Sequence, residues 1–298
     1  MYSAWLAPLA VAFNSVVWGL SWLPLQILQE QGLHPLWSTA LMYSVPVVGL
    51  LLWRRSAPLR PFAHHRDLWV LLVCAGLTTL CFNWAVTIGD VIRVVLLFYL
   101  MPVWTVFLAW WLLDERPTAG AMLRVAMALI GVSLVMKPAG SAWYQLQVPW
   151  PSNMADVLAI LGGFFFAATN VMLNRTSRIA PEARVFAMFI GGVVLCSAMA
   201  HIGVQTGTLG VTALPDFAWG WFGLALLFSL GFIASNLALQ YGSARVPAHT
   251  MSLIMLLEVV AATVSSALLG AAELGWQVAI GGSLVMAGAL MAVLSSRH

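Results

Sequence analysis

Ten apolar segments, each about long enough to cross a lipid bilayer, occupy almost the whole of this 298-residue chain. Hydrophobic residues make up 62% of it and charged residues only 8%, whereas a soluble surface needs about a quarter charged residues. A bilayer core about 30 Å thick takes about 20 helical residues at about 1.5 Å each. The composition therefore predicts an all-α integral membrane protein, with spans at residues 5–28, 36–53, 68–88, 91–112, 120–136, 155–174, 185–204, 218–240, 247–269 and 275–295.

The basic residues are divided very unevenly between the two ends of these spans. Of 13 Lys and Arg residues, only Arg93 and Lys137 fall on one side, and the other eleven fall opposite them. Cytoplasmic loops carry the excess of Lys and Arg, so both termini are expected in the cytoplasm, here of a bacterial inner membrane. The net charge of +3 therefore reflects a membrane boundary and not a nucleic-acid partner.

The two halves of the chain resemble each other in sequence. Trp18–Ser21 and Phe166–Thr169 occupy like places in spans one and six, and the pairs Leu112–Leu113 and Leu268–Leu269 end spans four and nine. The alternative is a chance likeness between apolar helices. Because five spans is an odd number, a duplicated second unit would enter the membrane upside down. We therefore expect two inverted five-helix repeats, at residues 1–137 and 155–298, joined by an extracytoplasmic linker at 138–154.

Three short motifs add to this pattern. The sequence Trp-Gly-Leu-Ser stands at Trp18–Ser21, Leu-Leu-Asp-Glu-Arg at Leu112–Arg116 and Val-Met-Lys-Pro at Val135–Pro138. With the two halves, they resemble the drug/metabolite transporter superfamily, and within it the EamA-type exporters similar to YddG-like exporters of aromatic amino acids. The resemblance implies a central cavity surrounded by spans 1, 3, 4, 6, 8 and 9, with spans 5 and 10 packed outside. In the second half no Arg follows Glu273, so the acidic-basic element is complete only in the first.

Glu258 is the one acidic residue well inside a predicted span. A charged side chain at that depth costs about 2.5–3.5 kcal/mol on insertion scales, so Glu258 is expected to face a cavity or a partner rather than lipid. There it would attract a substrate amino group or exchange a proton, which makes proton coupling possible. The alternative is a hydrogen-bonded carboxyl that joins helix nine to its neighbour.

A polar and aromatic face runs along span one. Trp18, Ser21 and Trp22 share it at helical spacing, and Phe166 and Asn170 form its counterpart in span six. Polar and aromatic residues at this depth are expected in the bundle interior, where the rings would stack on a substrate. The alternative is that the polar side chains only form hydrogen bonds between helices. The candidate substrate-binding residues are completed by Asn83, Tyr99 and Asn236. Pro102 lies within span four and is either a hinge for alternating access or a static kink.

No motif for catalysis, a metal or a cofactor accompanies these residues, so we expect no enzyme activity, no metal site and no cofactor. The sequence favours a secondary transporter that exports amino acids or related small aromatic metabolites and contacts only its substrate and the lipid bilayer. A multidrug or quaternary-cation efflux carrier and a small-molecule channel stay open as alternatives, and so do the direction, energy source and oligomeric state.

Overall fold

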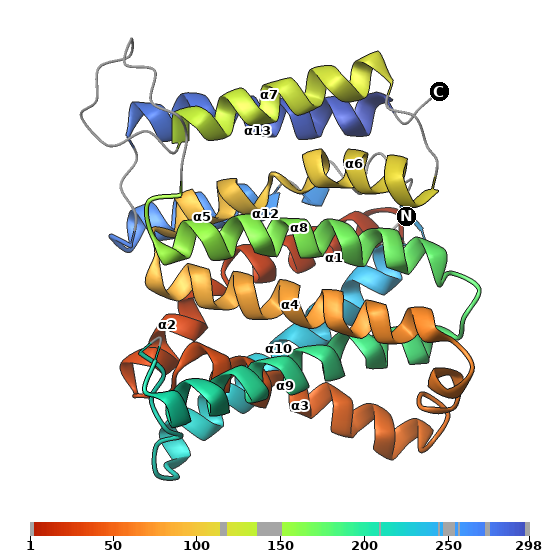
Figure 1. Cartoon of the computed structure of the whole chain (residues 1–298), viewed down its shortest axis with the longest axis vertical. Helices are drawn as coiled ribbons and strands as arrows, with labels where there is room; N and C mark the ends of the chain where they lie inside the picture. The colour runs from red at the N-terminus through yellow and green to blue at the C-terminus, as the bar shows by residue number, and fades with distance from the viewer. Residues whose placement is uncertain are drawn as a thin grey trace.

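The computed structural model describes residues 3–113, 118–135, 151–208, 210–243, 245–246, 254–255, 257–271 and 275–295. Within these ranges the chain is helical and contains no strand (Figure 1). The elements are α1 (Ser3–Gly19), α2 (Trp22–Glu30), α3 (Pro35–Arg54), the 3₁₀ helix η1 (Arg60–Ala63), α4 (Arg66–Ile88), α5 (Val91–Phe98), α6 (Met101–Leu113), α7 (Ala119–Val135), α8 (Met154–Arg175), α9 (Pro181–Thr206), α10 (Trp219–Ser243), α12 (Leu257–Leu268) and α13 (Trp276–Ser295).

These helices make up the ten predicted spans. Seven stretches are long and apolar enough to cross a membrane, and α7, α12 and α13 supply three shorter apolar helices within the described residues. The first span consists of α1 and α2, and the fourth of α5 and α6. The all-α, ten-helix prediction is therefore confirmed. The predicted start of the ninth span, at residues 247–253, and most of the predicted linker, at 138–150, lie outside the described residues.

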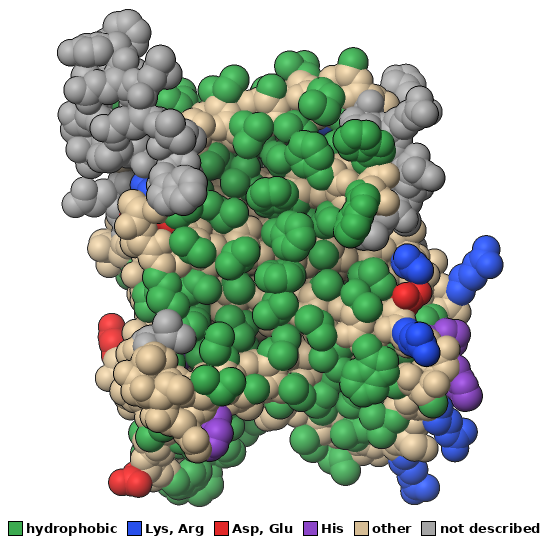
Figure 2. All heavy atoms as spheres, viewed as in Figure 1, with side chains coloured by type: hydrophobic (Ala, Val, Ile, Leu, Met, Phe, Trp, Pro, Cys, Tyr) green, Lys and Arg blue, Asp and Glu red, His purple; other side chains and the backbone are tan. Residues whose placement is uncertain are grey.

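The molecule has a broad apolar surface between two ends of different charge. Figure 2 shows hydrophobic side chains across the face, with basic side chains gathered at its right edge. Trp5, Leu52 and Trp111 are each at least 75% exposed, as expected of side chains that contact lipid. We call the end that carries η1 and Arg175 the arginine-rich end, and the end that carries Glu30, Asp90 and Asp216 the acidic end.

The helix packing follows the inverted repeat. Span three lies along span six as α4 on α8, and the equivalent pair with the halves exchanged is α10 on α1. Two further pairs, α3 with α9 and α7 with α13, each join a helix to its own counterpart. The α7–α13 pair lies at one side of the bundle in Figure 1, outside the other spans. The α4–α8 contact is more extensive than the α1–α10 contact.

Two spans are broken near their middle, and proline explains both breaks. The first is interrupted at Leu20–Ser21 and the fourth at Tyr99–Leu100. Pro24 and Pro102 have no N–H to donate to the carbonyl four residues earlier, so the helix cannot continue unchanged through these points. Instead, backbone N–H groups at the breaks bond to carbonyls only three residues earlier, from Leu23 N to Leu20 O at 3.1 Å and from Val103 N to Leu100 O at 2.9 Å. By contrast, α8 in span six runs unbroken.

Candidate substrate cavity

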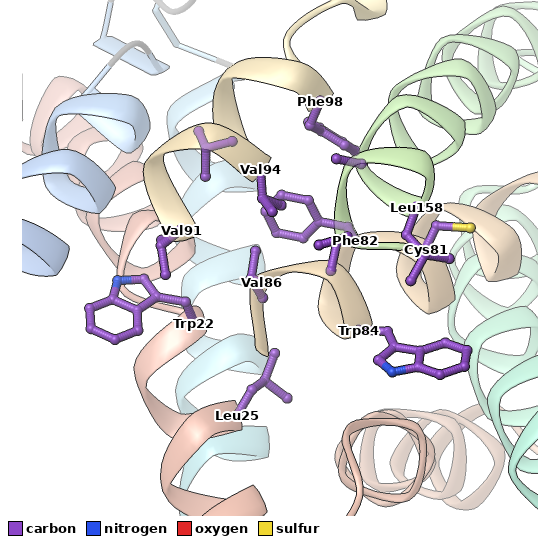
Figure 3. Close-up of a cluster of buried hydrophobic side chains, with 14 of the residues drawn as sticks. Trp22, Leu25, Cys81, Phe82, Trp84, Val86, Val91, Val94, Phe98 and Leu158 are labelled. Atoms are coloured by element: carbon purple, nitrogen blue, oxygen red, sulfur yellow. The ribbon is translucent and has the colours of Figure 1, made fainter. Parts of the chain in front are cut away.

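A small cavity lies beside both helix breaks. The lining side chains come from α1, α2, α4 and α5 of the first half and from α12 of the second, and they are Trp18, Gly19, Ser21, Trp22, Phe82, Val86, Val91, Val95, Glu258 and Ala262. The space between them is about 210 Å³, but no part of it is wide enough for a water molecule. In Figure 3, Trp22 lies beside Val91 while Phe82 and Val86 approach from α4. The cavity is therefore closed in this conformation.

Glu258 supplies the carboxylate of this cavity. It lies in the first turn of α12, and its side chain accepts a hydrogen bond from the Tyr99 hydroxyl. Tyr99 ends α5 at the break in span four, and it is only 6% exposed. The break thus brings the Tyr99 hydroxyl to a carboxylate of the other half. Among the described lining residues there is no Lys or Arg to neutralise Glu258.

One wall of the cavity is formed by Trp18, Ser21 and Trp22, around the break in span one. Trp22 is 2% exposed, and its indole Nε1 donates to the Ser265 hydroxyl at 3.0 Å. Trp18 meets Phe232 of α10 edge to face, with ring centroids 5.0 Å apart. Ser21 precedes α2 as its N-cap residue, but its side chain makes no capping hydrogen bond. Its hydroxyl therefore remains available at the N-terminus of a half-helix that faces the cavity.

A close helix approach holds this wall against Glu258. A Cβ added to Gly19 would lie 2.7 Å from the Ala261 Cβ and would also meet the Glu258 carbonyl oxygen. Only glycine permits that approach, because any side chain would separate α1 from α12. The glycine of the Trp-Gly-Leu-Ser motif therefore brings Trp18 and Ser21 to the same cavity as the carboxylate.

The remaining predicted residues do not line the cavity. Phe166 is one layer away, with its ring tilted against that of Phe98 and the centroids 5.3 Å apart, and Phe98 in turn packs on Phe82. The Asn83 amide donates to the Thr39 hydroxyl at 3.1 Å, and the Asn236 amide donates to the Phe232 carbonyl of its own helix at 2.9 Å. Asn170 is exposed. Pro102 lies at the break in span four, and its side chain is outside the described residues.

Sequence reasoning missed the aliphatic lining of the cavity. The lining includes Val86, Val91 and Val95. Residue type cannot distinguish them from valines that face lipid, because an apolar cavity wall and the lipid tails are equally apolar environments. Gly19 followed by Pro24 was the signal available for locating the cavity. Glycine indicates a close approach to another helix, and proline indicates a break in the helix shortly after it.

Comparison with known proteins identifies the family to which this fold belongs. Residues 5–137 and 153–294 both match the EamA-like transporter family. The chain belongs to the EamA-like transporter family. This match confirms the resemblance to the drug/metabolite transporter superfamily, and it assigns a multi-pass membrane transporter. Transporters of this kind are not normally enzymes.

Two individual proteins are similar to this EamA-like chain. An uncharacterized transporter of Pseudomonas aeruginosa is 28% identical over 188 residues, which span 58% of this chain and 60% of that protein. A crystal structure of a protein whose function is not stated has a TM-score of 0.58 and 21% sequence identity, and the match covers 98% of this chain and 97% of the other. At that identity the crystal structure supports the fold alone.

Proposed function

We propose that this EamA-like protein is a secondary transporter that exports amino acids or related small aromatic metabolites by alternating access. It would lie in the bacterial inner membrane with the arginine-rich end and both termini in the cytoplasm. The observation that carries the substrate proposal is the Glu258 carboxylate, which is bonded to Tyr99 in a cavity whose described lining, apart from Ser21, is otherwise apolar.

The chemistry of the cavity suits an ammonium group attached to an apolar body. A carboxylate without a basic partner in the lining attracts a cation, and the faces of Trp18 and Trp22 add cation–π attraction. The N-terminus of α2 offers a positive dipole end and the Ser21 hydroxyl, which makes no capping bond, to a substrate carboxylate. These two charged regions match the two ends of a zwitterionic amino acid, and the rings between them match an aromatic side chain.

The packing of the two halves supports a carrier over a channel. Inverted repeats provide two equivalent arrangements that open opposite sides, and in this structure the α4–α8 contact is more extensive than its counterpart between α1 and α10. No part of the cavity is wide enough for a water molecule, whereas ligand sites typically enclose about 300–1,000 Å³, so binding requires helices to separate. The breaks beside Ser21 and Tyr99 are the places where such bending costs least.

An efflux carrier for quaternary cations is the second candidate. Glu258, the one charged residue among the described lining residues, favours this candidate. A quaternary cation needs a negative counter-charge, but it has no carboxylate of its own for the protein to bind. In either case Glu258 also suits proton exchange, with a proton replacing the substrate cation during the return step.

Purified protein in liposomes tests the proposal. We would compare counterflow of an aromatic amino acid, its decarboxylated amine and a quaternary ammonium compound, with and without a proton gradient. We expect transport of the amino acid, acceleration by substrate on the opposite side, and a loss of about ten- to a hundredfold in Glu258→Gln. Glu30→Gln is the matched control, since Glu30 is exposed at the acidic end.

Two outcomes would contradict the proposal. Transport by Glu258→Gln at the wild-type rate and with the same pH dependence would remove Glu258 from the mechanism. Transport of the quaternary compound but not of the amino acid would favour the second candidate. The transport rate of Tyr99→Phe, which lacks one hydroxyl, is expected to fall between the rates of the wild type and Glu258→Gln.

A further inference from the structure

A hydrogen bond joins the two halves of the molecule at the wall of the cavity. Trp22, the first residue of α2, donates through its indole Nε1 to the Ser265 hydroxyl of α12 at 3.0 Å. The Trp22 ring itself lines the cavity. On α12, Glu258 and Ala262 also line it, and Ser265 follows them on the same face of the helix. The bond therefore connects two helices that both face the cavity.

The Ser265 hydroxyl is arranged to accept this bond. Its proton is donated to the Ala262 carbonyl of its own helix at 3.2 Å, which leaves the lone pairs of the oxygen for the indole. An indole N–H can only donate, so the two groups match. Ser266 lies in the same turn and is fully buried, and it donates to the same Ala262 carbonyl at 2.6 Å. The chain thus offers a neighbouring serine that differs from Ser265 in its relation to Trp22.

Span one and α12 run side by side toward the acidic end. Gly19 meets Ala261, and Trp22 meets Ser265 further along both helices, so the two advance in the same direction. Span one ends at Glu30, at the acidic end. The bond between Trp22 and Ser265 therefore lies nearer to the acidic end than the close approach at Gly19 does.

The Trp22 ring lies between Glu258 and the acidic end. Its partner Ser265 is seven residues beyond Glu258 on α12, which corresponds to about 10 Å along the helix. Figure 3 shows the ring beside Val91, the first residue of α5, and both side chains line the cavity. Tyr99, which bonds to Glu258, ends the same helix. A substrate that leaves Glu258 toward the acidic end must therefore pass the level of Trp22.

Passage at this level displaces the ring. Trp22 is 2% exposed, and no part of the cavity beside it admits a water molecule. The indole cannot leave its place between α12 and Val91 without breaking its bond to Ser265. A neutral hydrogen bond of this kind shifts an equilibrium about two- to tenfold. That is enough to favour the closed position of the ring, and little enough to be overcome in every transport cycle.

The inverted repeat does not duplicate this bond. When Trp18 is aligned with Phe166, the position equivalent to Trp22 is Asn170. When Leu112 is aligned with Leu268, the position equivalent to Ser265 is Ala109. Alanine has no hydroxyl, so the same bond cannot form from the equivalent positions at the arginine-rich end. The bond is a property of the acidic side alone.

We propose that Ser265 is a positioning residue that holds the Trp22 ring across the acidic side of the cavity, and that the ring releases Ser265 when substrate passes that side. The inference rests on the proposed transport function for its purpose. The position of the ring can nevertheless be tested without any substrate.

Thiol labelling of a cavity residue tests the role of Ser265. Val95, which lines the cavity one turn deeper than Val91, is replaced by cysteine in a background in which Cys74, Cys81 and Cys196 are serine. A membrane-impermeant maleimide is added to intact cells and, separately, to inside-out vesicles. A parallel Glu30→Cys variant shows which side of the membrane carries the acidic end, because Glu30 is exposed there. The test therefore does not depend on the proposed orientation.

Loss of the hydroxyl should open the acidic side more often. We expect Ser265→Ala to accelerate labelling of Val95→Cys about two- to tenfold from the side that labels Glu30→Cys, and not from the other side. Ser265→Thr keeps the hydroxyl and should restore a slow rate. Ser266→Ala is the matched control, since it removes a buried hydroxyl bonded to the same carbonyl, and it should leave the rate unchanged.

A double variant separates the hydrogen bond from general loosening. Trp22→Phe keeps a ring but has no N–H, so labelling should accelerate, and adding Ser265→Ala should accelerate it no further. An unchanged rate in Ser265→Ala would overturn the inference, and so would equal acceleration by Ser266→Ala or independent effects of the two changes in the double variant. If labelling follows the expected pattern but the liposomes transport no substrate, the proposed function fails and the role of Ser265 stands.

Discussion

Gly131 and Gly281 face each other across the α7–α13 pair, and each occupies the space that a side chain on the other would need. A Cβ added to Gly131 would lie 2.5 Å from the Gly281 carbonyl oxygen, and one added to Gly281 would meet the Gly131 carbonyl oxygen. The reciprocal contact places both glycines at the point where a helix of one half crosses its counterpart. Close approach of small residues is what holds membrane helices together where the solvent is itself apolar.

Gly131→Val should therefore destabilise the protein by about 1–3 kcal/mol, because the opposing atoms are backbone and cannot rotate away. Thermal unfolding in detergent, followed by circular dichroism, would show a lower midpoint. Gly288→Ala is the control, since its nearest neighbour would be the Arg124 carbonyl oxygen at 3.4 Å, an ordinary contact. Equal midpoints for the two variants would show that the α7–α13 contact is not tight.

Asn14 and Ser235 join α1 to α10 by two hydrogen bonds from one amide, at 2.7 Å to the hydroxyl and 3.2 Å to the carbonyl oxygen. We expect a double-mutant cycle of Asn14→Ala and Ser235→Ala to give a coupling energy of about 0.6–1.7 kcal/mol in detergent unfolding. Asn236→Ala is the matched control, because the Asn236 amide bonds only within its own helix. No coupling between Asn14 and Ser235 would contradict the contact.

His34 predicts a pH dependence of stability. It caps α3 by accepting from Leu36 N at 3.3 Å, and burial lowers the pKa of its imidazole from 6.5 to about 4. As the pH falls, the unfolded chain therefore takes up the proton before the folded protein does. The stabilisation from neutral His34 is complete above pH 6.5 and is lost progressively toward pH 4.

His34→Asn should remove this component while keeping a side chain that can cap α3. The measurement is the difference in unfolding midpoint between the wild type and the variant at pH 7.5 and pH 4.5. A constant difference across that range would show that His34 takes no part.

Trp18 should favour aromatic over aliphatic substrates. Ring stacking contributes about 0.5–1.5 kcal/mol, so Trp18→Leu should weaken binding of an aromatic amino acid about two- to tenfold and affect an aliphatic one less. Isothermal titration with purified protein measures both. Trp5→Leu is the control, because Trp5 is 75% exposed and does not line the cavity. An equal loss of affinity for both amino acids would show that Trp18 contributes to helix packing and not to recognition of the substrate's ring.

Much of the candidate site could be predicted from residue type alone. Glu258 is expected to face a cavity or a partner because an ionised carboxylate inside an apolar span is costly, and the structure pairs it with Tyr99. For Asn83 and Asn236 the same reasoning cannot tell a cavity residue from one that is bonded to the protein itself. An amide inside a bundle is satisfied equally well by a neighbouring helix, as Asn83 is by Thr39, or by its own backbone. The predicted roles in substrate binding remain predictions.

The amino-acid sequence by itself determined the membrane environment, the ten spans and the end of the molecule that carries the arginines. These depend on length, hydropathy and charge, which are local properties. Only the tertiary structure decided that Arg93 meets Asp156, that the break at Tyr99 turns its hydroxyl toward Glu258 and that Gly19 admits α12 to the cavity. Each of these contacts joins residues 63 or more positions apart, where the packing of whole helices, and not any local pattern, sets which side chains meet.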